Sequence, residues 1–192
     1  MVFALAGRRI DALEASHVRF PLVNVDIVAQ RLRELMTTSA PSAVVCSAAC
    51  GADLLALKTA HDLGIRYRIV LPFDRVRFRT TSVVDRPGEW GTLFDALYNI
   101  AETRHDVVII PQSVDDTMAY AVVNERIITE ALGLAGEVSS QEKAGFLAES
   151  VTAVIIWDGS SRGEGDLTAE FAARAQAIDI PLVVVDTLHA AN

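Results

Sequence analysis

The stretch VVCSAACGADLLALKTA, residues 44–60, passes from the apolar residues of a buried strand to those of a helix. The residues between them, 47–52, are all small. Small side chains let a helix and a strand pack closely, but they also let a ligand approach the backbone. A helix N-terminus favours an anion there, because its N–H groups are unpaired and its dipole is positive. The sequence leaves both explanations open.

Strand and helix patterns alternate along the rest of the chain. Short apolar runs predict strands over 2–6, 43–47, 66–71, 107–110, 151–157 and 181–185. Helical spacing predicts helices over 24–38, 51–64, 90–101, 116–135, 139–149 and 167–178, whereas 72–87 has no clean period and is expected to be irregular. Continuously apolar strands separated by helices are typical of a sheet covered on both faces. The predicted fold class is α/β, a doubly wound, mostly parallel sheet.

Composition is that of an ordinary globular protein. The chain has 192 residues, of which 51% are hydrophobic and 22% are charged, so we expect a single domain over residues 1–192 with a full core. Its longest apolar runs are too short to span a bilayer, and residues 1–20 lack the apolar stretch of a signal peptide. We therefore expect a cytoplasmic protein that does not enter a membrane.

The cysteines and histidines indicate no metal site. Cys46 and Cys50 are the only cysteines, and in a reducing compartment two buried thiols are expected in preference to a disulfide. The four histidines are scattered and form no metal-ligand pattern with the cysteines.

Charge is distributed unevenly. The formal net charge of −8 argues against a general nucleic-acid binder, which needs a basic face. Arginines nevertheless gather in two places, as Arg8 and Arg9 and as Arg66, Arg68, Arg75, Arg77, Arg79 and Arg86. These are either a solvated surface or a local site for an anionic small molecule. In the second case we expect Arg8, Arg9 or the Arg75–Arg79 group to line the site.

The segments after the strands are candidate ligand sites, because open α/β sheets bind ligands beyond the carboxyl ends of their strands. Turns use Gly, Ser and Asp for local reasons as well, so a structural role stays open for each residue. The candidates are Gly7, Arg8 and Arg9 after the first strand, Ser47, Ala48, Gly51 and Asp53 at the corner, Pro72 and Phe73 after the third strand, and Asp158 and Gly159 after the fifth.

Particular chemistry suits four of the polar candidates. Arg8 or Arg9 could hold a phosphate with a bidentate fork. Asp53 stabilises the start of its helix by roughly 0.3–1 kcal/mol without any ligand, and it would repel a phosphate. If it binds a ligand, it should accept a hydrogen bond from a hydroxyl such as that of a ribose. Asp158 could bind ribose hydroxyls or form a local Asx-turn.

Tyr120 and Asn124 lie one helical turn apart and share a helix face with Asp116. A polar stripe of this kind is usually solvated. Tyrosine and asparagine nevertheless suit stacking on a base and hydrogen bonding to it, so both residues are candidates for ligand binding.

Five segments, in order, resemble the SLOG superfamily of Rossmann-like proteins: FALAGRRID (3–11), SAACGADLLAL (47–57), IVLPF (69–73), AYAVVNERI (119–127) and VIIWDGSSRGEGDLTAEF (154–171). That superfamily includes the LOG ("Lonely Guy") nucleotide phosphoribohydrolases, molybdenum-cofactor carriers, DNA-processing protein A and nucleotide-sensing domains of bacterial defence effectors. The resemblance spans nearly the whole chain. It implies that a nucleotide or nucleotide derivative binds across the strand ends, often in a homodimer or higher homo-oligomer.

The segment 163–170 departs from the LOG pattern Gly-Gly-x-Gly-Thr-x-x-Glu, whose backbone cradles a phosphate. The resemblance implies ligand contacts by Gly163, Gly165 and Thr168. Glu164 replaces a glycine, however, and the final glutamate, Glu170, stands five residues after Gly165 instead of four. Two extra acids, Glu164 and Asp166, would oppose a bound phosphate.

Three functions remain open. We favour a nucleotide-binding or sensing module without chemistry of its own. The alternative is a phosphoribohydrolase or other N-glycosidic hydrolase, with Glu170 or Asp158 as the catalytic acid–base or nucleophile. A DNA-binding role is disfavoured by the net charge.

Overall fold

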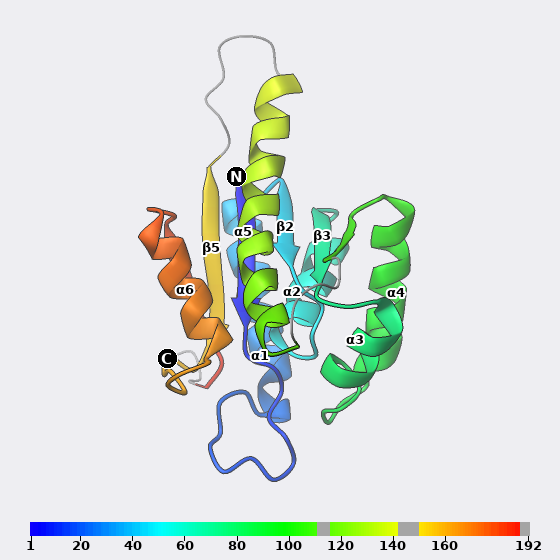
Figure 1. The fold of residues 1–192 in the computed structure, drawn as a ribbon, viewed down its shortest axis with the longest axis vertical. Helices are drawn as coiled ribbons and strands as arrows, with labels where there is room; N and C mark the ends of the chain where they lie inside the picture. Colours follow the sequence, from blue (N-terminus) through cyan, green and yellow to red (C-terminus); the bar gives the residue numbers. More distant parts are fainter. Residues whose placement is uncertain (111–115, 142–149, 189–192) are drawn as a thin grey trace.

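The computed structural model describes residues 1–110, 116–141 and 150–188. Six strands form one sheet in the order β4-β3-β2-β1-β5-β6, and all its pairings are parallel (Figure 1). The strands are β1 (Val2–Gly7), β2 (Ala43–Cys46), β3 (Arg66–Leu71), β4 (Val107–Ile109), β5 (Val151–Trp157) and β6 (Leu182–Asp186). The predicted α/β class is confirmed, and the sheet is consistent with Rossmann-like folds.

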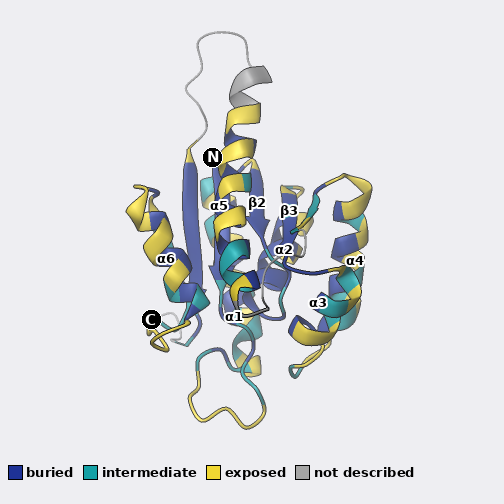
Figure 2. Cartoon of the chain, viewed as in Figure 1, coloured by how far each residue is buried: buried dark blue, intermediate teal, exposed yellow. Residues whose placement is uncertain are grey.

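Helices cover both faces of the sheet. On one face lie α1 (Val25–Ser39), α2 (Ala52–Asp62) and α4 (Trp90–Thr103), and on the other lie α5 (Asp116–Gln141) and α6 (Leu167–Ala177) (Figure 1). Alternation along β1 supplies both cores: Phe3 and Leu5 pack on the first face, Val2 and Ala4 on the second. Figure 2 shows the strands buried and an exposed side on each of α4, α5 and α6.

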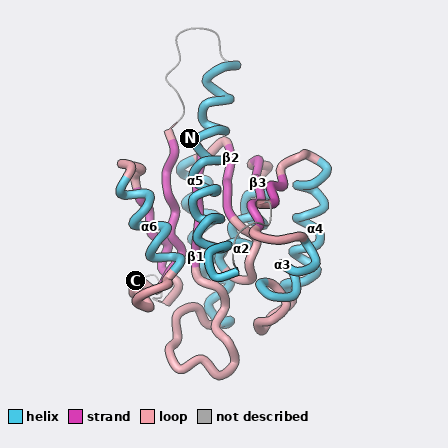
Figure 3. The backbone as a smooth tube through the Cα atoms, in the orientation of Figure 1, coloured by secondary structure: helices cyan, strands magenta, loops and turns pink. Residues whose placement is uncertain are grey.

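The carboxyl ends of the parallel strands meet at one edge. The loop that leads from β1 towards α1, and the connection from β5 to α6, both lie at this edge (Figure 3). β1 and β5 are neighbours, yet the helices that follow them cover opposite faces. This is the switch in strand order at which open α/β sheets form ligand crevices.

A helix lies within residues 72–87, which corrects the expectation that they are irregular. This helix, α3, spans Arg75–Ser82. The Asp74 side chain caps it by accepting hydrogen bonds from the backbone N–H groups of Val76 (3.0 Å) and Arg77 (3.1 Å). Phe78 and Ser82 are its only buried residues, so the apolar pattern was too sparse to predict a helix.

The expected break between helices near residues 136–138 is also wrong. α5 continues unbroken to Gln141, while residues 142–149 of the expected second helix lie outside the described part of the chain. Among the described residues, no helix has both the length and the apolar character needed to cross a membrane.

Glycines let the end of β1 touch the start of α2. A Cβ on Gly7 would lie 2.4 Å from the Cβ of Ala52 and 2.7 Å from the carbonyl oxygen of Ile156. Gly51 has a φ of +97°, and a Cβ there would lie 2.8 Å from the backbone nitrogen of Ile10. Close packing therefore accounts for the glycines at both positions.

We expect Gly7→Ala to lower the free energy of unfolding by about 1–3 kcal/mol, because the added methyl group overpacks the junction of β1, β5 and α2. Urea unfolding monitored by circular dichroism measures this loss. Gly133→Ala is the matched control: its Cβ would meet nothing within 4 Å, and alanine in a helix should stabilise by about 0.5–1 kcal/mol. A Gly7→Ala protein as stable as the wild type would contradict the packing argument.

Candidate functional site

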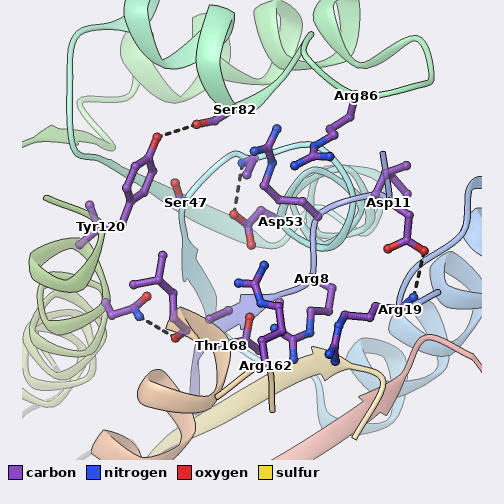
Figure 4. A pocket seen from close by; sticks show the side chains of 18 of the residues that line it. Arg8, Asp11, Arg19, Ser47, Asp53, Ser82, Arg86, Tyr120, Arg162 and Thr168 are labelled. Atoms are coloured by element: carbon purple, nitrogen blue, oxygen red, sulfur yellow. Dashed lines mark hydrogen bonds between the residues drawn. The ribbon is translucent and has the colours of Figure 1, made fainter. Parts of the chain in front are cut away.

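A cleft of about 860 Å³ opens at the carboxyl edge of the sheet (Figure 4). Its walls come from the loop after β1, the β2–α2 corner, α3 and the turn after it, α5, and the β5–α6 connection. The residues selected from the sequence that line it are Gly7, Arg8, Arg9, Ser47, Asp53, Tyr120, Asn124 and Thr168.

The other selected residues lie outside the cleft lining. Ala48 and Gly51 are buried in the corner, and Pro72 and Phe73 are buried near α5, where the Phe73 ring meets Tyr120 edge-to-face at 5.7 Å between centroids. Gly159, Gly163 and Gly165 are exposed and have positive φ, as local turns require. Ligand contacts by these residues stay predictions.

The buried guanidinium of Arg8 joins the two sides of the switch point. Its Nε donates to Asp158 Oδ1 (2.9 Å), and its Nη1 and Nη2 donate to the two carboxylate oxygens of Asp166 (2.6 and 2.9 Å). Nη2 also donates to the Ser160 carbonyl (2.6 Å). Every guanidinium nitrogen of Arg8 thus has an acceptor within the chain, so Arg8 holds the β5–α6 connection against β1.

Asp166 also occupies the N-terminus of α6. Its carboxylate accepts hydrogen bonds from the backbone N–H groups of Arg162 (2.6 Å), Thr168 (3.1 Å) and Ala169 (3.4 Å). Burial works to raise the pKa of Asp166, but the Arg8 guanidinium and these N–H groups outweigh it and hold that pKa well below its usual range. A carboxylate of the chain itself therefore occupies the anion position at this helix end.

Asp158 and Glu170 are poorly placed for acid–base chemistry. Burial works to raise the pKa of Asp158, but hydrogen bonds from Ser160 and Arg8 outweigh it and lower that pKa. Asp158 Oδ2 also accepts from Arg19 Nη1 (2.7 Å), so the carboxylate stays ionised and fully bound. Glu170 is exposed on α6 and lies outside the cleft lining. Neither geometry favours the catalytic role considered for these residues.

Asp53 differs from Asp158 and Glu170 because it is buried, lines the cleft and has a raised pKa. It lies in the first turn of α2, is only 7% exposed, and lines the cleft (Figure 4). One carboxylate oxygen accepts the N–H of Ala49 (3.2 Å), and within the described chain no cation forms an ion pair with it. Burial raises the pKa of Asp53 to about 7, although the Ala49 N–H and the charge of Arg9 oppose this. Near neutral pH, Asp53 can therefore donate or accept a proton.

Arginines line the cleft opposite Tyr120. Figure 4 places Tyr120 on one side, Arg19 and Arg86 on the other, and Asp53 between them. Arg9 and Arg162 also line the cleft. Of the arginines expected at the site, Arg8 and Arg9 line the cleft, but the Arg75–Arg79 group lies outside its lining: Arg75 and Arg79 each pair with Asp95 at 3.0 Å.

The α5 wall is polar at Tyr120 and Asn124 and apolar at Val123 and Ile127. The Tyr120 hydroxyl forms a hydrogen bond with Ser82 Oγ (2.9 Å). Asn124 Nδ2 donates to the Leu167 carbonyl (2.8 Å). This stripe of α5 therefore faces the cleft, and its polar side chains are held in place. The side chain of Asp116 lies outside the described part of the chain.

Sequence reasoning did not select Arg19, Ser82, Ser161 or Arg162, which also line the cleft. Ser82 lies on the helix that the pattern failed to predict. Arg19 and Arg162 lie in loops, where the sequence has no period that predicts the position of a side chain, and they form ion pairs with Asp158 (2.7 Å) and Asp166 (3.8 Å).

Cys46 and Cys50 are buried free thiols, as expected. Over residues 1–110, 116–141 and 150–188, no three His, Cys, Asp or Glu side chains are grouped so that they could hold a metal ion. The chain matches no protein-family model and no curated protein.

We expect Arg8→Met to cost about 3–5 kcal/mol of stability, because it removes the buried cation that Asp158 and Asp166 share and leaves them only the more exposed Arg19 and Arg162. Urea unfolding of the variant and the wild type gives the difference. Arg33→Met is the control, since its pair with Asp62 is half-exposed and should contribute less than about 1 kcal/mol. Equal losses in the two variants would contradict a central role for Arg8.

Asp53 should make stability depend on pH. Its carboxyl ionises at the ordinary value of 3.8 in the unfolded chain and at about 7 in the folded one. Between these values only the folded state retains the proton, so the unfolding free energy falls as pH rises, by at most about 1.4 kcal/mol per pH unit. Above the folded pKa this loss is complete.

Asp53→Asn should remove that slope, so the stability difference between variant and wild type should shift in favour of the variant between about pH 5 and pH 8. Urea unfolding at several pH values measures it. Asp62→Asn, which changes a partly exposed acid at the other end of α2, is the control and should leave the slope in place. A pH-independent difference for Asp53→Asn would show that Asp53 does not titrate in this window.

Proposed function

We propose that the chain binds a nucleotide or nucleotide derivative in the cleft and serves as a binding or sensing module without chemistry of its own. The observation that carries this proposal is the position of the cleft at the β1–β5 switch point, with arginines on one side and Tyr120 and Asn124 on the other. Its volume of about 860 Å³ lies in the range of small-molecule sites.

The phosphate, the base and the ribose of a nucleotide each suit a different part of the cleft lining. The phosphate binds at the arginines, because guanidinium groups donate charge-assisted hydrogen bonds to phosphate oxygens. The base belongs against α5, where Tyr120 offers a ring and Val123 an apolar surface. Asp53 lies between them and suits a ribose hydroxyl, since its carboxylate accepts a hydrogen bond when ionised.

Membership of the SLOG superfamily is part of the proposal. It rests on the order of the five motif segments and is supported by a Rossmann-like sheet of the kind that the resemblance implies. The homodimer or higher homo-oligomer implied by the same resemblance stays a prediction.

A hydrolase acting on an N-glycosidic bond is the second candidate, and Asp53 is the observation that favours it. A buried carboxyl with a pKa of about 7 can protonate a leaving base and then take a proton from the attacking water. Asp11, another acid in the cleft, already accepts the N–H groups of Arg19 (2.9 Å) and Phe20 (3.0 Å).

The test is a thermal-shift screen with AMP, ADP, ATP, NAD and cyclic mononucleotides, followed by chromatography of each stabilising compound after incubation. A bound nucleotide at 100 times its Kd should add about 2.7 kcal/mol of stability. Recovery of the intact compound supports a binding module, whereas release of the free base supports the hydrolase. Failure of the whole panel to stabilise the protein would contradict the proposal.

Tyr120→Ala should weaken binding of the most stabilising nucleotide from this panel by about 5- to 100-fold, because stacking on a base contributes roughly 1–3 kcal/mol. Titration calorimetry measures the change. Met118→Ala is the matched control on the same helix: Met118 is 56% exposed, lies outside the cleft lining, and should leave the affinity unchanged. Equal affinity of the Tyr120→Ala protein and the wild type would place the base elsewhere.

A further inference from the structure

Two arginines of the cleft have buried hydrogen-bond donors that no described residue satisfies. The Nε atoms of Arg9 and Arg86 are buried, and neither has a hydrogen-bond acceptor among the described residues. Both side chains line the cleft. Buried N–H groups without acceptors are rare because each costs free energy, so two of them in one cleft indicate acceptors supplied from outside the chain.

The same two arginines share one carboxylate, that of Asp85. Arg9 Nη2 donates to Asp85 Oδ1. Arg86 Nε lies 3.7 Å from Asp85 Oδ2, which is too long for a hydrogen bond. The Asp85 side chain is 34% exposed and lies outside the cleft lining. Asp85 therefore offsets positive charge at this pair but leaves both Nε groups unsatisfied.

A further position suited to an anion, the N-terminus of α6, is already filled. At the N-terminus of α6, the N–H groups of Thr168 and Ala169 donate to Asp166, and the same carboxylate binds Arg8. Thr168 and Arg8 line the cleft, but their donors already bind the Asp166 carboxylate. A phosphate entering the cleft finds unused donors at Arg9 and Arg86 instead.

We infer that Arg9 and Arg86 form the phosphate subsite of the cleft, and that Asp85 is an internal anion which a ligand's phosphate displaces. This inference rests on the proposed function, since it names where the phosphate of a nucleotide binds. A phosphate brings more charge and more acceptor oxygens than one carboxylate, so it can satisfy the Nε groups that Asp85 leaves unpaired. Asp85 is partly exposed, so water readily replaces its contact with Arg9.

Binding of inorganic pyrophosphate, measured by titration calorimetry, tests the subsite independently of any base. We expect Arg9→Gln and Arg86→Gln each to weaken it at least ~10-fold, as loss of a charge-assisted hydrogen bond implies. Asp85→Asn should strengthen it about 2- to 5-fold, because it removes the competing anion. Asp95→Asn is the matched control: Asp95 also joins two arginines and is 36% exposed, but it lies outside the cleft and should change nothing.

Failure of the wild type to bind pyrophosphate, or binding that is insensitive to both arginine variants, would overturn the subsite. Arg86 is on a surface turn, where a substitution perturbs folding less. If Arg9→Gln unfolds the protein, the pyrophosphate affinity of Arg86→Gln alone tests the subsite. The midpoint of thermal unfolding of each unliganded variant shows whether it is folded.

Parallel titrations with ADP, GDP and their nucleosides separate this inference from the proposed function. Equal weakening of nucleotide and nucleoside binding by the arginine variants would reject the subsite and leave the proposed function intact. Pyrophosphate binding through the two arginines, with no gain from an attached nucleoside, would support the subsite and reject the proposed function.

Discussion

The buried ion pairs of Arg8 hold the carboxyl edge of the sheet together. Arg8 follows β1, and its partners Asp158 and Asp166 follow β5, so their contacts fix the two loops that diverge at the switch point. Desolvating these charges is costly, and the cost is offset only because every nitrogen of Arg8 finds an oxygen. The position of the cleft wall at 161–168 depends on this closed network.

The same network places a carboxylate of the chain itself at the N-terminus of α6, beside the glycine-containing turn. Asp166 caps the helix with its own carboxylate, and Arg8 neutralises that charge. In the cleft, the buried Nε atoms of Arg9 and Arg86 have no acceptor among the described residues, and the pKa of Asp53 is raised to about 7. These unpaired donors lie across the cleft from α6, towards the turn that follows α3.

Most of the fold could be predicted from the sequence, because buried parallel strands are continuously apolar and helices repeat their apolar residues every three or four positions. Gly7, Ser47 and Asp158 were expected at one edge of the sheet, because parallel strands end at the same edge. α3 could not be predicted, because it buries only Phe78 and Ser82. Charged side chains were the least predictable part, because each depends on partners far away in sequence. Asp166 looked adverse to the site until its contact with Arg8, 158 residues earlier, was known.

The pairing of β1 with β5 has a consequence for how the chain folds. Val2 pairs with Val151, whereas the other edge of β1 pairs with β2, which begins at Ala43. During synthesis from the N-terminus, β1 to β4 can associate first, while one edge of β1 stays open until residues 151–157 emerge. Contacts between segments so distant in sequence form slowly, because a long loop must close before they are gained. The part of the cleft between β1 and β5 can therefore form only after these residues have emerged, and a truncated or stalled chain exposes a central strand edge there.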